Sequence, residues 1–254
     1  MHATVTIAAY TLLEALRNRL LWLLGASALA AIGLSGFLQE LALTEGRQIQ
    51  LALLAALLRF AAVFLIATFV VTSMVREAND KGMELLLALP VPRAAYLFGK
   101  LGGFAALACL PALLFGALCL CFAPFGQTAL WSVSLLWELW IVAAFSLLCV
   151  LGLGQVLPAL AAVAGFYLLA RSVGSLQLMA HGPLGRHGAA QQALQAGIDG
   201  IAALLPRLDL FTRSEWLLYH TGNAQVLFEL FLHSAACLAL LASAALFDLY
   251  RKSI

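Results

Sequence analysis

Apolar residues occupy six long stretches of the chain, separated by short polar segments. A helix that crosses roughly 30 Å of hydrocarbon needs about 20 mostly apolar residues, because each residue advances the helix by 1.5 Å. These stretches predict six transmembrane helices, at about residues 20–38, 51–75, 96–122, 131–151, 153–170 and 224–247. Only residues 152–154 separate the fourth span from the fifth, so one fused helix is the alternative there. The pattern predicts an all-α membrane protein in which residues 1–254 form a single transmembrane domain.

Two segments outside these spans also have helical periodicity. Before the first span, apolar residues recur at helical spacing: Val5, Ala8, Ala9, Leu12, Leu13 and Leu16. This spacing predicts an amphipathic helix in the membrane interface, with an upstream extension of the first span as the alternative. The outer segment 171–223 contains a second amphipathic pattern at about 190–205, ended by Pro206, and a shorter one at 209–219. We expect amphipathic helices there, the longer one resting on the membrane or on a neighbouring subunit.

The composition supports a membrane protein and excludes several other classes. Hydrophobic residues make up 64% of the chain and charged residues 10%, with a mean hydropathy of +1.00. A soluble domain of ordinary composition is about 25% charged, and it needs those charges to keep its surface in water. The net charge of +2 is too small to favour a nucleic-acid partner. We therefore expect lipid around the chain and no nucleic acid bound to it.

The positions of Lys and Arg predict the orientation in the membrane. With six spans, one side of the membrane collects eight basic residues: Arg17, Arg19, Arg76, Lys81, Arg93, Lys100, Arg251 and Lys252. The other side holds four: Arg47, Arg186, Arg207 and Arg213. Short cytoplasmic loops retain basic residues in excess. We therefore expect a multi-pass protein of the inner (plasma) membrane with both termini in the cytoplasm.

Ionisable residues inside the spans form the first candidate site. Arg59 and Glu229 fall at similar predicted depth, and His233 follows Glu229 by one helical turn. Because a lone charge in hydrocarbon is costly, we expect Arg59 and Glu229 to pair or to share a polar cavity with His233. The trio could line a substrate or proton path, or it could be a structural ion pair. A second span that begins near Phe60 would instead leave Arg59 at the interface. Glu138, between two tryptophans, is assigned to an interfacial aromatic belt.

The segment between the second and third spans is the second candidate site. Residues 76–95 form a charged loop on the basic side, in which residues 83–89 favour a short helix that stops before Pro90. Leu85, Leu86 and Leu89 give this helix an apolar face that a soluble partner could grip. An ordinary loop anchored by positive charge is the alternative.

The same segment carries a recognisable motif: Glu77, Gly82, Glu84, Leu86-Leu87, Pro90, Arg93 and Gly99-Lys100. This motif resembles the cytoplasmic signature of permease subunits of type-2 ABC exporters, with a weaker likeness to the subgroup for multicopper-enzyme maturation. The resemblance implies a homodimer or heterodimer of permeases, vectorial transport, and a separate ATPase subunit that docks at the loop. The coupling residues that it implies are Arg76, Glu77, Gly82, Glu84, Leu86, Leu87, Pro90, Arg93 and Lys100.

The chain lacks a nucleotide-binding motif of its own. The sequence contains no G-x-x-x-x-G-K-[ST], and Gly99-Lys100 is followed by Leu101 at the start of a predicted span. We therefore expect no cofactor or metal on this chain, with ATP and Mg²⁺ bound by the partner subunit. Two other functions compete with transport. One is a non-catalytic assembly or scaffold protein; the other is an intramembrane enzyme, for which Ser27 and His233 lie at unequal predicted depths.

Overall fold

The computed structural model describes residues 2–41, 46–80, 92–180 and 189–251. All the regular structure in these ranges is helical: α1 (His2–Arg17), α2 (Leu20–Leu41), α3 (Gly46–Asn79), α5 (Arg93–Cys119), α6 (Phe125–Leu153), α7 (Val156–Ala180), α8 (Ala189–Leu204), the 3-10 turn η1 (Leu208–Leu210), α9 (Ser214–Tyr219) and α10 (Ala224–Arg251). Six of these helices, α2, α3, α5, α6, α7 and α10, are long and apolar enough to cross a membrane. The predicted all-α membrane fold with six spans is confirmed.

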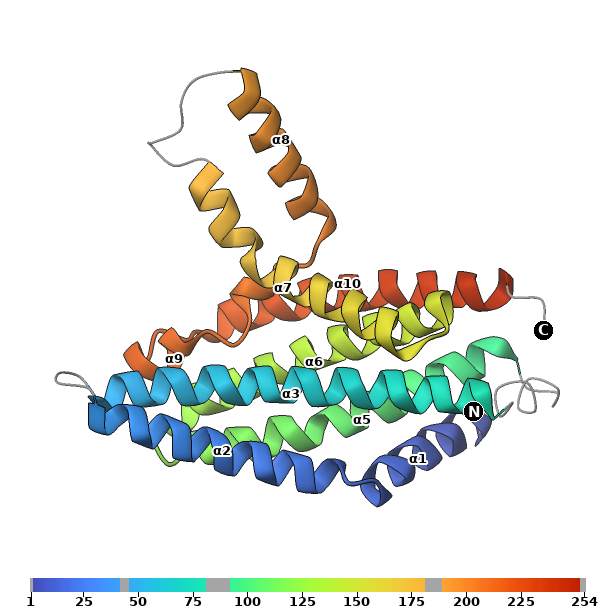
Figure 1. Ribbon diagram of the computed structural model, residues 1–254, viewed down its shortest axis with the longest axis horizontal. Coiled ribbons are helices and arrows are strands. Elements are labelled where there is room, and N and C mark those ends of the chain that lie inside the picture. The colour runs from blue at the N-terminus through green and yellow to red at the C-terminus, as the bar shows by residue number, and fades with distance from the viewer. Residues whose placement is uncertain (1, 42–45, 81–91, 181–188, 252–254) are drawn as a thin grey trace.

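The spanning helices form a bundle with α6 at its centre. Helix α6 packs against α3, α5, α7 and α10, and its buried residues include Trp131, Leu135 and Leu139. The start of α1, the end of α3, the start of α5 and the end of α10 lie at one end of the bundle, which we call the termini end (Figure 1). The end of α2, the start of α3 and the start of α6 lie at the opposite end, the far end. This arrangement is the one that an even number of spans produces.

Several observed helices extend beyond the predicted spans. Helix α3 begins at Gly46 instead of residue 51, and α7 continues ten residues past the predicted end at residue 170. The residue that ended the predicted fifth span is Arg171, and in the structure it has a carboxylate partner inside the bundle. Helix α6 ends at Gly154, which separates it from α7. The φ of +67° at Gly154 is a left-handed conformation that glycine adopts without strain. The fused-helix alternative is therefore wrong.

Two glycines allow α1 to pack closely against α5. A Cβ atom at Gly99 would lie 2.8 Å from the Ile7 Cβ, and one at Gly103 would lie 2.6 Å from the Thr11 Cβ. Small residues four apart commonly bring two helices together in this way. Helix α1 is also separate from α2, because it ends at Arg17 and α2 begins at Leu20. The N-terminal segment is thus a helix of its own, and the extension alternative is wrong.

This contact gives a sharp test of the packing. Gly103→Ala is expected to lower the free energy of unfolding by about 1–3 kcal/mol, because the new methyl group overlaps Thr11 and the Ala8 carbonyl. The matched control is Gly102→Ala, whose Cβ would meet only the Ala8 Cβ at 3.7 Å. That change is expected to be neutral or stabilising by up to about 1 kcal/mol, since alanine is the better helix former. Tryptophan fluorescence during unfolding in SDS measures both, and equal effects would contradict the contact.

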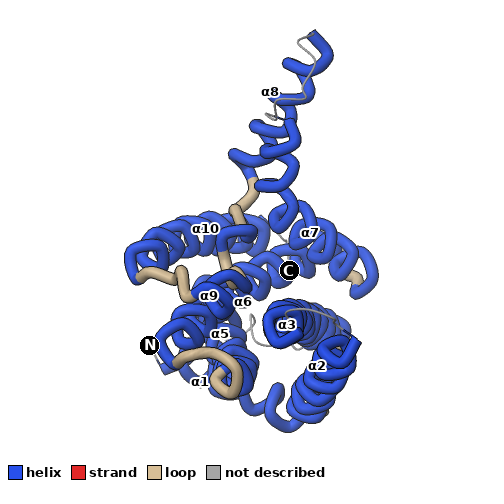
Figure 2. The backbone as a smooth tube through the Cα atoms, turned by 90° about the vertical axis from the view of Figure 1, so that its left-hand side faces the viewer, coloured by secondary structure: helices blue, strands red, loops and turns tan. Residues whose placement is uncertain are grey.

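Helices α7 and α8 form a hairpin that projects away from the bundle (Figures 1 and 2). The Gln177 Nε2 donates to the Asp199 carboxylate at 3.3 Å, and the Gln195 Nε2 donates to the Ala180 carbonyl at 2.7 Å. The predicted helices at 190–205 and 209–219 correspond to α8 and to the shorter α9. The support of α8 within the chain is α7, a partner that the amphipathic pattern did not identify.

Candidate functional site

A fully buried carboxylate, Glu138, is the centre of a polar cluster inside the bundle. It lies on α6, and its side chain is 0% exposed. One carboxylate oxygen accepts hydrogen bonds from the Tyr167 hydroxyl at 2.9 Å and from the Arg171 guanidinium at 3.3 Å. The other oxygen accepts from the Thr212 hydroxyl at 2.6 Å. The expected interfacial belt is therefore a wrong interpretation of Glu138, which joins α6, α7 and the turn before α9.

Thr212 belongs to the same cluster and has an unusual backbone conformation. Its φ of 45° is uncommon for a β-branched residue and has to be held by its surroundings. The Thr212 N–H donates to the Ser134 hydroxyl at 2.9 Å, and its carbonyl accepts from Arg59 at 3.3 Å. Arg171 also donates to the carbonyls of Leu208 and Phe211, at 2.7 and 3.0 Å. These contacts fix the segment between α8 and α10 to the side of the bundle.

Arg59 contributes a second guanidinium, which lies on α3 and is buried. It is 8% exposed, and its charge lies 4.9 Å from the centre of the Phe60 ring. Its guanidinium donates to the Thr212 carbonyl and also interacts with the Tyr167 hydroxyl, whereas its Nε is buried without a partner. Among the described residues of this cluster, Glu138 is the one carboxylate that contacts Arg171 directly. It is linked to Arg59 through Thr212. A guanidinium without a carboxylate partner is costly to bury, so this side chain points to a function beyond packing.

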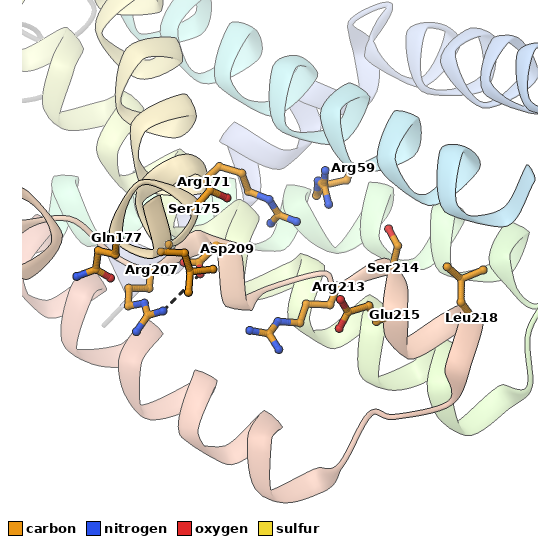
Figure 3. Close-up of a pocket in the computed structure, with 12 residues that line it drawn as sticks. Arg59, Arg171, Ser175, Gln177, Arg207, Asp209, Arg213, Ser214, Glu215 and Leu218 are labelled. Carbon is orange, nitrogen blue, oxygen red and sulfur yellow. Dashed lines mark ion pairs between the residues drawn. The ribbon is translucent and has the colours of Figure 1, made fainter. Parts of the chain in front are cut away.

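Arg59 and Arg171 face a cavity of about 1000 Å³ beside the cluster. Its walls come from α3, from α7 and from the segment 207–218, and they include four arginines: Arg59, Arg171, Arg207 and Arg213. Figure 3 shows these side chains around one open space, with Asp209 paired to Arg207 at 3.6 Å. The two lining carboxylates are Asp209 and Glu215, so positive charge is in excess.

The structure does not assemble the predicted trio of Arg59, Glu229 and His233. Glu229 is exposed on α10, and no ion pair among the described residues joins it to Arg59. His233 is also exposed, and its Nε2 accepts a hydrogen bond from the Arg207 N–H at 3.2 Å. The predicted Arg59–Glu229 pairing is wrong, because equal depth on two helices does not place their side chains on facing surfaces. The acidic residue of the cluster comes from α6 instead.

At the termini end, the structure pairs two residues of the loop motif. The Lys100 ammonium lies 2.5 Å from the Glu77 carboxylate, with side-chain exposures of 7% and 15%. The Tyr96 hydroxyl donates to the same carboxylate at 3.2 Å. The sequence pattern named Glu77 and Lys100 separately and did not predict their contact. The pair joins the last turn of α3 to the second turn of α5, on either side of the loop.

Two other arginines of the motif connect the same region to further helices. Arg76 makes an ion pair with Glu14 of α1 at 2.7 Å, and Ser73 also donates to Glu14. Arg93 donates to the carbonyls of Leu249 and Tyr250 near the end of α10, at 2.9 and 3.3 Å. The remaining motif residues, Gly82, Glu84, Leu86, Leu87 and Pro90, lie outside the described residues, as does the predicted helix at 83–89.

The described residues offer no group of three His, Cys, Asp or Glu side chains that could hold a metal ion. What the helices define is a multi-pass membrane protein with charged residues buried between its spans, a feature of proteins that move solutes or ions.

The chain belongs to the ABC-2 family transporter protein family, whose model matches residues 11–177, from within α1 to the end region of α7. It is therefore a membrane transport permease of the type-2 ABC class, as the loop motif predicted. The weaker likeness to the multicopper-maturation subgroup is not confirmed. No curated protein matches the chain.

Proposed function

We propose that this chain is the permease subunit of an ATP-driven exporter in the plasma membrane. Two permeases form the translocation path, both termini of each lie in the cytoplasm, and a separate ATPase subunit that binds ATP and Mg²⁺ docks at residues 76–100. The observation that carries this proposal is the buried Glu77–Lys100 pair within a segment that the family model covers. In this proposal, movement of the docked ATPase subunit is transmitted to α3 and α5 through this pair.

The contacts around the loop supply a physical route for coupling. The pair ties α3 to α5, Arg76 ties α3 to α1, and Arg93 ties α5 to the end of α10. Four helices are thus linked at the point where the loop leaves and re-enters the bundle. Packed helices move as rigid units, so displacement of this loop is expected to shift several spans together. A scaffold protein that undergoes no transport cycle would not need these links between the loop and four helices.

Co-purification with an ATPase tests the proposal. The permease is co-expressed with an ABC ATPase subunit encoded beside its gene, and the ATPase recovered with it and its rate of ATP hydrolysis are measured. We expect Glu84→Lys and Leu86→Glu, both in the loop motif, to reduce recovery of the ATPase strongly. Arg47→Gln is the control, since Arg47 is exposed at the far end of α3.

Two outcomes would contradict the proposal. One is full recovery of the ATPase with both loop variants. The other is labelling of cysteines placed in the loop by a membrane-impermeant reagent added outside intact cells. Either result would favour the scaffold alternative over transport driven through this loop.

A further inference from the structure

An apolar groove lies along α3 and α7 beside the arginine-lined cavity, where Arg59 of the cavity contacts the Phe60 ring of the groove. The groove has a volume of about 470 Å³. Its α3 wall contains Phe60, Val63, Phe64 and Ala67, and its α7 wall contains Leu157, Leu160, Ala161, Val163, Ala164, Tyr167 and Leu168. Arg59 immediately precedes the α3 wall, and Arg171 follows Tyr167 by one helical turn. The cavity and the groove are therefore neighbours, and together they present a basic region next to an apolar one.

Two of the four guanidinium groups in the basic region have no ion-pair partner among the described residues. Arg171 is paired with Glu138, and Arg207 is paired with Asp209. Within the described part of the chain, Arg59 makes no ion pair with a carboxylate, and its Nε is buried without a partner. Arg213 is half-buried, and the described residues supply it with neither a hydrogen bond nor an ion pair. Phosphate oxygens bind guanidinium groups strongly, through short and frequently paired hydrogen bonds.

The basic and apolar regions follow one another along the bundle in the same order as the phosphate and the acyl chain of a phospholipid. Helix α3 runs from the far end to the termini end, so the groove residues 60–67 lie on the termini side of Arg59. Helix α7 runs the opposite way, and its groove residues 157–168 also lie on the termini side of Arg171. An amphiphile whose phosphate occupies the cavity would extend its hydrocarbon chain along the groove, away from the far end. Phe64 is 67% exposed, which leaves apolar surface for such a chain.

We propose that this surface binds an anionic phospholipid of the leaflet at the far end of the bundle. The phosphate contacts Arg59 and Arg213, and one acyl chain lies between α3 and α7. Binding requires neither ATP nor a partner subunit, so this proposal stands or falls separately from the exporter function.

Lipid binding to the purified full-length chain in detergent tests the proposal. The probes are phosphatidylglycerol and phosphatidylcholine, each with a fluorophore at the end of one acyl chain, and the readout is the dissociation constant. We expect the anionic lipid to bind about ten-fold more tightly than the zwitterionic lipid, because both offer a phosphate but the choline cation is repelled by the four arginines of the cavity. Arg213→Gln is expected to remove this preference, whereas Arg47→Gln, exposed on the same helix as Arg59, is expected to keep it.

A second pair of variants tests the groove independently of the charge. Phe64→Ala is expected to weaken binding of both lipids several-fold. Phe228→Ala, which removes a similarly exposed phenylalanine on α10, is expected to leave binding unchanged. Inorganic phosphate in the millimolar range is expected not to displace the lipid, because it has no chain. Equal binding of the two lipids, equal loss in the two arginine variants, or displacement by phosphate would overturn the proposal; the last result would identify a site for free anions.

Discussion

Glu138→Ala is expected to destabilise the protein more than any other single change in the polar cluster around Thr212. Removing this carboxylate deletes its hydrogen bonds with Tyr167, Arg171 and Thr212 and leaves Arg171 without its ion-pair partner. Breaking a buried ion pair on one side costs about 3–5 kcal/mol, since the remaining charge stays desolvated. We therefore expect a loss of that order in the free energy of unfolding, measured by tryptophan fluorescence during titration with SDS.

Two further variants separate the charge from the carbon skeleton. Glu138→Gln keeps the shape and one acceptor oxygen, so its cost is expected to be lower than that of Glu138→Ala. Glu229→Ala removes an exposed acidic residue from another span and is expected to change stability by less than about 0.5 kcal/mol. If Glu229→Ala were as damaging as Glu138→Ala, the Arg59–Glu229 pairing predicted from depth would be right after all and the observed cluster wrong.

The position of Glu138 also shows which information the sequence contained. Six spans, their order and the short helices before the last span could be predicted, because apolar length and periodicity are local properties. Glu138 is the only charged residue of α6 and lies at its middle, the fourteenth of 29 residues. Starting that span at Trp131 instead of Phe125 moved it toward the predicted interface. The neighbouring tryptophans then suggested a belt, although Trp131 is fully buried.

Which helix faces meet could not be predicted in the same way. Arg59 was identified as a costly buried charge, and the structure agrees that it is buried. Its surroundings depend on how α3, α6 and α7 are rotated and on a turn around Thr212 that has no apolar period. Ending the fifth span before Arg171 removed the residue that completes the cluster. Arg171 lies at the edge of an apolar stretch and was therefore taken as the end of the span. Its carboxylate partner, Glu138, lies 33 positions earlier in the chain.

The termini end shows the complementary case, in which a motif identified the residues but not their contact. Glu77 and Lys100 are 23 positions apart, and a loop motif describes each of them singly. Only the antiparallel packing of the end of α3 against the start of α5 brings the two side chains together. Tyr96 is one turn before Lys100 on α5, so its hydroxyl reaches the same carboxylate. The motif therefore combines residues of the loop itself with residues that hold the two helices beside it.

Charge reversal at Glu77 and Lys100 is expected to have the second largest effect. Either Glu77→Lys or Lys100→Glu places two like charges within a largely buried contact, and each is expected to lower the free energy of unfolding by about 3 kcal/mol. The double reversal restores opposite charges and is expected to recover at least half of that loss. Residues in direct contact couple in this way, whereas independent sites would give additive losses.

The same three variants distinguish a coupling role from a purely structural one. With the co-expressed ATPase, the double reversal is expected to restore protein yield and ATPase binding to near the wild-type level. An additive loss in the double variant would contradict the contact between Glu77 and Lys100. Full stability together with uncoupled ATP hydrolysis would show that the orientation of the pair, and not only its attraction, transmits movement from the loop to α3 and α5.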